Sequence, residues 1–321
     1  MMQDALKTFP QQFDFVPVIH NHEKLPQDNR PVILCGMGGS HLSADIFNVL
    51  AHGRIRAIHM DYGLPHITRS DLHGALLVMS SYSGNTEEVL EAYDAAKEAG
   101  YTMCAMAVGG KLLERAAADG IPYIQFPNVG IQPRAALGYG VVALASLLHE
   151  RSTLEELHTL KLDVERARMS GEMLAEKLRG KIPLIYSSSR NGAIAQNWKI
   201  KFCENTKIPA FWNSIPELNH NEMTGFDAID STRELSKQIS VIILMDAEDH
   251  PCNRRRCEIT AELYKERGIE VTTIELSGAS RAERIFSSLM IADWTSVLLG
   301  EFYGVETEQV PMVEEFKKAI A

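Results

Sequence analysis

Short apolar runs alternate with amphipathic stretches along the first half of the chain. Each run has the length of a buried strand, and the segments between them carry apolar residues at helical spacing. The runs are residues 31–35, 55–60, 75–79, 101–108 and 121–126. Alternating strands and helices predict a parallel sheet with helices on both faces and ligand-binding loops at the carboxyl ends of the strands.

The second half repeats this order of elements. Strands are predicted over residues 183–186, 239–245 and 268–276, with helices between them. The strongly charged stretch 151–179 keeps leucines and methionines at helical spacing, which predicts one long surface helix joining two domains. We therefore expect two α/β domains, residues 1–152 and 153–321, although no repeat is visible in the sequence itself.

The stretch 81–86, Ser-Tyr-Ser-Gly-Asn-Thr, lies between a predicted strand and a predicted helix. The first helical turn offers unpaired backbone N–H groups and the positive end of the helix dipole, and Gly84 allows close approach of the backbone. Ser81, Ser83 and Thr86 add neutral donors, so a phosphate can bind here without a lysine. A serine-rich helix cap without any ligand has the same local sequence.

A second glycine- and serine-rich turn, residues 36–40, follows the first predicted strand. Gly38, Gly39 and Ser40 fit a tight turn that meets a small ligand, or one that only starts a helix. The dinucleotide fingerprint needs a glycine where His41 stands, and the Walker lysine is absent, so nucleotide binding is disfavoured. Because both turns follow parallel strands, we expect them to converge on one crevice.

Arg134 lies directly before a small, apolar helix that follows the last strand of the first half. The start of a helix favours anions, so an arginine there is best explained if it faces a bound anion. A solvated loop arginine is the alternative.

Composition limits the classes of partner. The 321 residues include 32 basic and 42 acidic side chains, a formal net charge of −10. This balance argues against nucleic acid or an anionic membrane as the main partner. The first residues lack signal-peptide features and no apolar run is expected to reach membrane-spanning length, so we expect a cytoplasmic protein. His250, Cys252 and Cys257 match no zinc spacing, and no metal site is predicted.

The most informative part of the sequence is residues 197–211 followed by 216–222, Pro-Glu-Leu-Asn-His-Asn-Glu. Together with the two glycine- and serine-rich turns, Arg134 and a C-terminal lysine, it resembles the bifunctional phosphoglucose/phosphomannose isomerase family. Each motif is weak alone, but all occur in order over essentially the whole chain. The resemblance implies two sugar-isomerase (SIS) domains, each a parallel sheet flanked by helices.

The resemblance also implies an activity, the isomerisation of a hexose 6-phosphate through a cis-enediol without metal or organic cofactor. Glu204 matches the family's base, and His220 the residue that opens the sugar ring. Arg134 would stabilise the enediolate, and Ser40 together with the hydroxyls of residues 81–86 would hold the 6-phosphate.

The C-terminal lysine that assists ring opening is assigned to Lys317, whereas Lys318 is expected to be solvated. In this family the histidine is expected to come from a neighbouring subunit, which implies a homodimer with shared active sites. Without the resemblance, Glu204 reads as a helix-end carboxylate paired with Lys201 or Lys207.

Two questions stay open at this point. Some members of the family place a hydroxyl seven residues before the lysine, where this chain has Val310, so use of mannose 6-phosphate as well as glucose 6-phosphate is undecided. The alternatives are another SIS enzyme, acting on amino-sugar phosphates, and a sugar-phosphate sensor without turnover. The acidic balance argues against a sensor that binds DNA.

Overall fold

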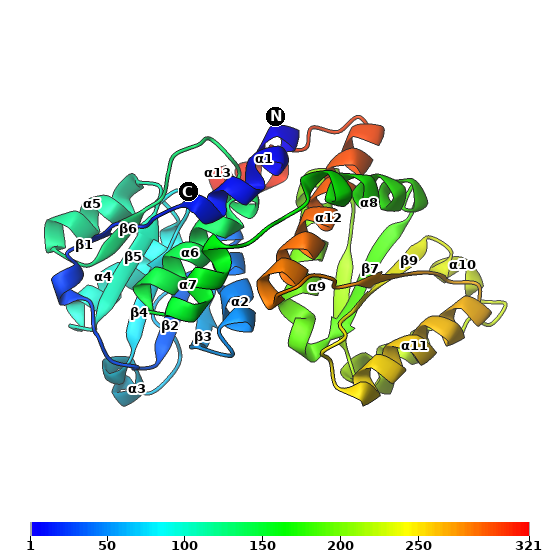
Figure 1. Cartoon of the computed structure of the whole chain (residues 1–321), viewed down its shortest axis with the longest axis horizontal. Helices are drawn as coiled ribbons and strands as arrows, with labels where there is room; N and C mark the ends of the chain where they lie inside the picture. The colour runs from blue at the N-terminus through cyan, green and yellow to red at the C-terminus, as the bar shows by residue number, and fades with distance from the viewer. Residues whose placement is uncertain (1, 321) are drawn as a thin grey trace. The chain divides into compact units, whose positions relative to one another are not determined.

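The computed structural model describes residues 2–320, which form two compact units (Figure 1). The first unit spans Thr8–Leu160, and the second unit combines residues 2–7 with residues 161–320. The chain leaves the first unit after α7 (Arg151–His158) because this helix packs there, with Leu157 buried and His158 Nδ1 2.7 Å from the carbonyl oxygen of Phe13.

The prediction of one long helix over residues 151–179 is wrong. The structure has α7 and a separate α8 (Val164–Lys177). The break is local: Asp163 is the N-cap of α8 and its side chain accepts a hydrogen bond from the backbone N–H of Arg166 at 2.9 Å. An N-cap of this kind starts a new helix.

The first unit contains a sheet of six strands in the order β1-β6-β5-β4-β2-β3. All neighbours are parallel except the short β1, which pairs antiparallel with β6. The strands are β1 (Ile19–His20), β2 (Val32–Gly36), β3 (Ile55–His59), β4 (Leu76–Ser80), β5 (Met103–Ala107) and β6 (Tyr123–Gln125). The predicted parallel sheet is confirmed, and β1 is the strand that the apolar pattern did not predict.

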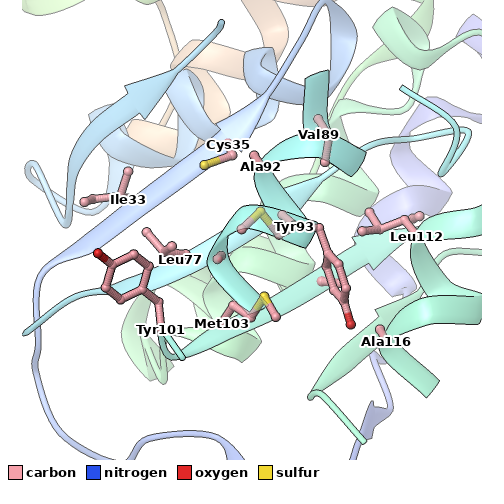
Figure 2. Close-up of a cluster of buried hydrophobic side chains, with 14 of the residues drawn as sticks. Ile33, Cys35, Leu77, Val89, Ala92, Tyr93, Tyr101, Met103, Leu112 and Ala116 are labelled. Atoms are coloured by element: carbon pink, nitrogen blue, oxygen red, sulfur yellow. The ribbon is translucent and has the colours of Figure 1, made fainter. Parts of the chain in front are cut away.

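Helices of the first unit cover this sheet. They are α2 (Gly39–Leu50), α3 (Arg69–Gly74), α4 (Glu87–Glu98), α5 (Gly110–Asp119), α6 (Leu137–Leu147) and α7, with short 3₁₀ turns η1 (Phe9–Asp14), η2 (His22–Lys24) and η3 (Pro133–Ala135). Figure 2 shows one core, in which side chains of β2, β4 and β5 meet those of α4 and α5. Leu77 and Tyr93 are fully buried there. Burying these apolar faces is the main force that holds the layers together.

The second unit contains a fully parallel sheet of four strands in the order β10-β9-β7-β8. The strands are β7 (Ile182–Ser188), β8 (Phe211–Ile215), β9 (Ile239–Met245) and β10 (Glu270–Glu275). Strand β8 was missed from the sequence because it is an edge strand with exposed aromatic residues, Phe211 and Trp212, instead of a buried apolar run.

The helices of the second unit are α1 (Met2–Thr8), α8, α9 (Gly192–Lys201), α10 (Arg233–Ser236), α11 (Pro251–Glu266), α12 (Arg281–Phe302) and α13 (Pro311–Ile320). A π-helical turn, η5 (Phe202–Thr206), continues α9, and 3₁₀ turns form η4 (Ser189–Asn191), η6 (Glu217–His220) and η7 (Glu222–Phe226). Helices α8 and α12 pack closely: a Cβ on Gly171 would lie 2.6 Å from the Cβ of Trp294.

The expectation that no segment reaches membrane-spanning length needs correction for α12. Within residues 2–320 this one helix is long and apolar enough to cross a membrane, by length and composition alone. However, 72% of the tested window is buried inside the structure, as in the core helix of a folded unit. The apolar residues of α12 are interspersed with buried polar ones such as Ser288, Asp293 and Ser296, which is why no apolar run stands out in the sequence.

Candidate functional site

The glycine-rich turn after β2 packs directly against the segment that carries Arg134. A Cβ on Gly39 would lie 2.6 Å from the Cβ of Pro133 and 2.9 Å from the backbone nitrogen of Arg134, so only glycine fits there. Gly38, the residue before α2, has a φ of 52°. The structure therefore brings Gly38 and Gly39 together with Arg134 in the first unit.

Hydrogen bonds join the two turns that were predicted to converge. The side-chain oxygen of Ser40 accepts a hydrogen bond from the backbone N–H of Tyr82 at 2.7 Å, and the Ser80 hydroxyl donates to the Ser40 carbonyl at 3.1 Å. The convergence of the loops after β2 and β4 is thereby confirmed. It follows from sheet order, because β2 and β4 are parallel neighbours whose carboxyl ends share one edge.

The side chain of Ser81 shapes the loop 81–86 from within. Its oxygen lies 2.8 Å from Thr86 Oγ1 and accepts a hydrogen bond from the N–H of Gly84 at 3.0 Å, and Ser81 is buried. Gly84 has a φ of 72°, and a Cβ there would lie 1.8 Å from the carbonyl oxygen of Gly109. The loop conformation therefore requires glycine at this position.

No side-chain hydrogen bond from the N-cap residue caps the start of α4. Thr86 is the N-cap residue of α4, yet its side chain makes no cap hydrogen bond and contacts Ser81 instead. The first-turn N–H groups of the helix are thus uncapped by that side chain, and they form a favourable position for an anion. Ser83 is exposed beside them, and its oxygen accepts the N–H of Asn85 at 3.2 Å.

Arg134 lies in η3 and is only 2% exposed, which rules out a solvated loop arginine. The segment that follows it is fixed by Gln12, a residue that sequence patterns did not indicate. Gln12 Nε2 donates to the carbonyl oxygen of Ala135 at 2.7 Å, and its Oε1 accepts from the N–H of Gly138 at 2.9 Å. The N-terminal arm thereby holds the backbone beside Arg134.

Two further side chains near these loops had no interpretation from the sequence. His41 is buried, and its Nδ1 lies 2.7 Å from Asp45 Oδ2 one turn along α2. The Tyr82 hydroxyl is buried and has no hydrogen-bond partner among the described residues. Burial raises the pKa of Tyr82 to about 12, so the hydroxyl stays protonated.

In the second unit, Glu204 lies on the π-helical turn η5 and is partly buried. π-helical turns are rare in proteins, and those that do occur are often found at functional sites. The neighbouring residues are fixed to α12: Asn205 Nδ2 donates to Ser296 Oγ at 2.9 Å, and the Thr206 hydroxyl donates to the Ser296 carbonyl at 2.6 Å. The backbone that carries Glu204 is therefore held in place from one side.

A buried ion pair also fastens this segment to α12. Lys201 Nζ lies 2.7 Å from Asp293 Oδ1, and both side chains are at most 4% exposed. Lys201 was one of two lysines that sequence alone paired with Glu204. The other, Lys207, donates from Nζ to the carbonyl oxygens of Glu204 and of Gln309, the latter at 2.6 Å.

His220 is presented on an exposed loop whose other polar residues hold the loop together. Asn219 Nδ2 donates to Thr260 Oγ1 at 2.9 Å, and Asn221 Nδ2 donates to Glu217 Oε1 at 2.7 Å. The His220 side chain makes no hydrogen bond, ion pair or ring contact with any residue that the structure describes. Its imidazole is therefore available to a ligand or to another chain.

Lys317 lies on α13, a helix without any buried residue. Its Nζ is 2.8 Å from Glu314 Oε1. The predicted site residues thus fall into two groups. The first unit holds Gly38, Gly39, Ser40, Ser81, Ser83, Thr86 and Arg134, and the second unit holds Glu204, His220 and Lys317.

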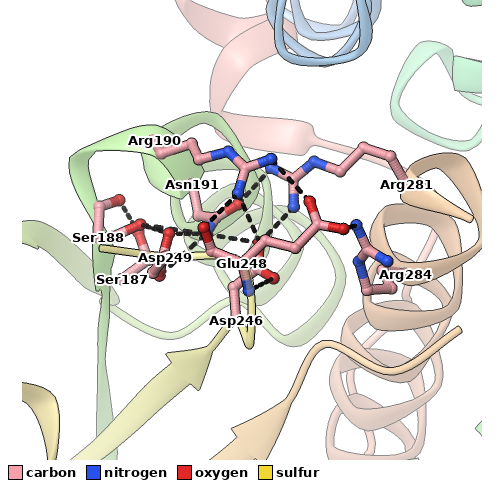
Figure 3. A network of polar contacts seen from close by, with 9 residues as sticks. All are labelled: Ser187, Ser188, Arg190, Asn191, Asp246, Glu248, Asp249, Arg281 and Arg284. Carbon is pink, nitrogen blue, oxygen red and sulfur yellow. Dashed lines mark hydrogen bonds and ion pairs between the residues drawn. The ribbon is translucent and has the colours of Figure 1, made fainter. Parts of the chain in front are cut away.

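The serine-rich turn of the second unit, after β7, is closed by carboxylates of the loop that follows β9, as Figure 3 shows. Ser188 Oγ donates to Asp249 Oδ1 at 2.7 Å, and Asn191 Nδ2 donates to the same oxygen at 3.1 Å. Burial raises the pKa of Asp249 above its ordinary value. The polar side chains of this turn are therefore bonded to carboxylates of the protein.

Arginines surround this closed turn. Arg281 pairs with the buried Asp246, while Arg190 and Arg284 both pair with Glu248 (Figure 3). Burial acts to raise the pKa of Asp246, but the backbone N–H of Glu248 and the charge of Arg281 outweigh it, so the pKa is lowered. Among residues 2–320, no group of three or more His, Cys, Asp or Glu could hold a metal ion.

Comparisons with known proteins first establish the fold class. The profile described as "Bacterial phospho-glucose isomerase C-terminal SIS domain" matches residues 168–320. Among solved structures, glucosamine-6-phosphate deaminase from Thermotoga maritima has a TM-score of 0.67 at 15% identity, over 97% of this chain and 96% of that one. Tagatose-6-phosphate ketose/aldose isomerase from Escherichia coli has a TM-score of 0.65 at 16% identity, over 95% and 94%. The chain has the SIS fold.

Sequence relatives then define the family. A bifunctional phosphoglucose/phosphomannose isomerase of Caldicellulosiruptor bescii is 34% identical, over 92% of this chain and 91% of the relative. One of Aquifex aeolicus is 31% identical, over 93% of each. A D-glucosamine-6-phosphate 4-epimerase of Sulfolobus acidocaldarius is 27% identical, over 88% and 87%. The chain belongs to the bifunctional phosphoglucose/phosphomannose isomerase family.

The buried ion pair gives a first prediction. Replacing Asp293 by Ala leaves the Lys201 charge buried without this partner, which should lower the free energy of unfolding by about 3–5 kcal/mol. Urea denaturation would measure the change. As a control, Asp94→Ala removes an exposed pair with Arg115 and should cost at most about 1 kcal/mol. Equal losses in the two variants would contradict the anchoring role of the Lys201–Asp293 pair.

Proposed function

We propose that this chain interconverts glucose 6-phosphate, and also mannose 6-phosphate, with fructose 6-phosphate. The observation that carries the proposal is the 34% identity to a bifunctional phosphoglucose/phosphomannose isomerase over 92% of the chain. The uncapped start of α4 and the buried Arg134, both in the first unit, support it, since a phosphate needs backbone donors and a developing negative charge needs a cation.

In this proposal the first unit binds the 6-phosphate. The phosphate accepts hydrogen bonds from the N–H groups at the start of α4 and from hydroxyls of Ser40, Ser83 and Thr86. Ser81 contributes by holding the loop, because its oxygen contacts Gly84 and Thr86. Gly38 and Gly39 let the backbone approach the ligand.

Glu204 is the proposed base. Isomerisation moves a proton between C2 and C1 of the open-chain sugar, and one carboxylate on one face of the resulting cis-enediol can take it and return it. The anchored π-turn supports this role, since a base must keep its distance to both carbons. Arg134 would offset charge that develops on the enediolate, an interaction strengthened where water is excluded.

His220 and Lys317 are proposed to assist opening of the sugar ring, with His220 supplied by the second subunit of a homodimer. Two exposed features support this arrangement. His220 lies on a surface loop, and α13 exposes an apolar face beside Lys317. That face consists of Met312, Val313, Phe316 and Ile320, which are 46–82% exposed. An apolar helix face without cover is typical of a protein interface.

A second candidate is chemistry on amino-sugar phosphates, such as the relative from Sulfolobus acidocaldarius whose name is D-glucosamine-6-phosphate 4-epimerase. That relative is 27% identical, compared with 34% for the isomerase. The higher identity favours hexose phosphates as the substrate class.

The role of Glu204 gives a second prediction. Glu204→Gln keeps the size of the side chain but removes the base, so kcat should fall by about 10²–10⁴-fold with little change in KM. Steady-state kinetics on glucose 6-phosphate would measure both constants. Glu266→Gln makes the same change at an exposed position of α11 and should keep the normal kcat. A normal kcat in Glu204→Gln would remove the assignment.

Shared active sites give a third prediction, which concerns mixed dimers. Glu204→Gln and His220→Ala should each be nearly inactive alone, but a dimer of one copy of each has one site with both groups intact. Unfolding and refolding the two variants together at equal amounts should restore about a quarter of the wild-type activity. If each subunit completes its own site, the mixture stays as inactive as its components, and the shared-site proposal is wrong.

A further inference from the structure

A pocket of about 460 Å³ lies in the second unit between α8, β10 and α12. This volume falls within the range of small-molecule sites, roughly 300–1,000 Å³. Glu204, His220 and Lys317 are not among the residues that line it. The pocket is therefore a separate feature that the proposed isomerisation does not use.

Helix α8 turns one polar face toward this pocket. Arg166, Ser170 and Lys177 line it at helical spacing, and Lys161 lines it just before the helix. Within residues 2–320, none of these four side chains takes part in a hydrogen bond or an ion pair. Three cations and a hydroxyl thus face one pocket with their donors unused.

The acidic residues of α8 do not neutralise these cations, because they pair with other arginines. Arg168 binds Glu165 at 2.7 Å and Glu172 at 3.2 Å, and Arg179 binds Glu176. The ion-paired residues of α8 therefore do not line the pocket, whereas its unpaired cations do.

Two of the three carboxylates that line the pocket are engaged at helix starts. Asp163 accepts the N–H of Arg166 at 2.9 Å, and Glu283 accepts the N–H of Ala279 at 2.9 Å. The third, Glu275, is exposed. None of the three forms an ion pair with Lys161, Arg166 or Lys177, so the donors of these cations are not occupied by the carboxylates of the pocket.

Strand β10 adds backbone donors and an apolar wall. The consecutive residues 272–275 all line the pocket, so the pocket follows the open edge of this strand. The backbone N–H of Leu276 donates to the carbonyl oxygen of Met245 in β9 at 2.7 Å. Backbone groups alternate in direction along a strand, so those of Thr273 and Glu275 point away from β9, toward the open edge of the sheet. Apolar contact comes from Leu174, Ile274 and Ile291.

We propose that this pocket binds an organic phosphate. Unpaired cations match a phosphate dianion, and hydroxyl and backbone donors can bind its remaining oxygens. The apolar wall suits the non-phosphate part of the ligand, which a bare ion lacks. Nucleotides and sugar phosphates share this chemistry.

The pocket also touches the helix that holds the Glu204 segment. Ser287 and Ile291 line the pocket from α12, and Asp293 and Ser296 of the same helix anchor that segment. The proposal itself concerns binding only. Its test needs no isomerase activity, so its failure and that of the proposed function are distinguishable.

Hydrogen exchange of the full-length protein locates binding. With adenosine 5′-monophosphate or glycerol 3-phosphate, amides of residues 163–177 and 270–278 should become protected in a saturable manner, whereas adenosine should protect none. If adenosine 5′-monophosphate protects these amides at the lower concentration, the ligand is a nucleotide. If glycerol 3-phosphate does, the ligand is a sugar-like phosphate. Because the first unit is also proposed to bind phosphate, protection there is scored separately.

Variants test the contacts. Arg166→Glu/Lys177→Glu should weaken binding by about tenfold or more, since two charge-assisted contacts are reversed. Lys265→Glu, at an exposed lysine of α11 outside the pocket, should leave binding unchanged. Ser170→Phe fills the pocket without a change of charge, so it should also abolish protection of the pocket amides. This variant keeps the proposal testable if the double variant misfolds.

Three results would overturn the proposal. The first is unchanged binding in both Arg166→Glu/Lys177→Glu and Ser170→Phe. The second is protection of amides in the first unit only. The third is that inorganic phosphate protects the pocket amides as strongly as the organic phosphates do. The last result would mean an adventitious ion only.

Discussion

The buried contact between Lys201 and Asp293 is the interaction on which the proposed chemistry of the second unit depends. It joins the end of α9 to the middle of α12 at 2.7 Å, and the hydrogen bonds of Asn205 and Thr206 to Ser296 continue the attachment. A buried ion pair contributes little net stability, because desolvation offsets the attraction, but removing one partner is costly because it leaves a buried charge. The π-turn that carries Glu204 is therefore attached to α12 on both sides of the base, through Lys201 before it and through Asn205 and Thr206 after it.

Both units contain a serine-rich turn at the start of a helix, but the hydrogen bonds of the two turns differ. Each has a parallel strand that ends in a serine-rich turn at the start of a helix. In the first unit Thr86 turns toward Ser81 and leaves the start of α4 uncapped, whereas in the second unit Asp249 bonds to Ser188 and Asn191. The side chains of the second turn are thus bonded to a carboxylate of the protein, whereas within residues 2–320 no carboxylate bonds to Ser81 or Thr86 in the first. The proposed function accordingly assigns the 6-phosphate of the isomerase substrate to the first unit.

The sequence predicted the parallel sheets because buried parallel strands appear as continuous apolar runs, such as residues 75–79. It also predicted that the turns at Ser40 and Tyr82 meet, since sheet order brings them to one edge. It missed β8, whose exposed aromatic residues resemble no buried strand, and the break between α7 and α8, which depends on one capping aspartate. The partners of Lys201 and Gln12 lie about 90 and 120 residues away, and no local pattern encodes such contacts.

The central claim is that the chain isomerises hexose 6-phosphates. The most direct measurement is formation of fructose 6-phosphate by the purified protein, with EDTA present, from glucose 6-phosphate and from mannose 6-phosphate in separate reactions. The account predicts turnover of both, which would also show that Val310 is tolerated at the position before α13. Absence of turnover with both substrates, in a folded protein, would contradict the account and direct attention to amino-sugar phosphates.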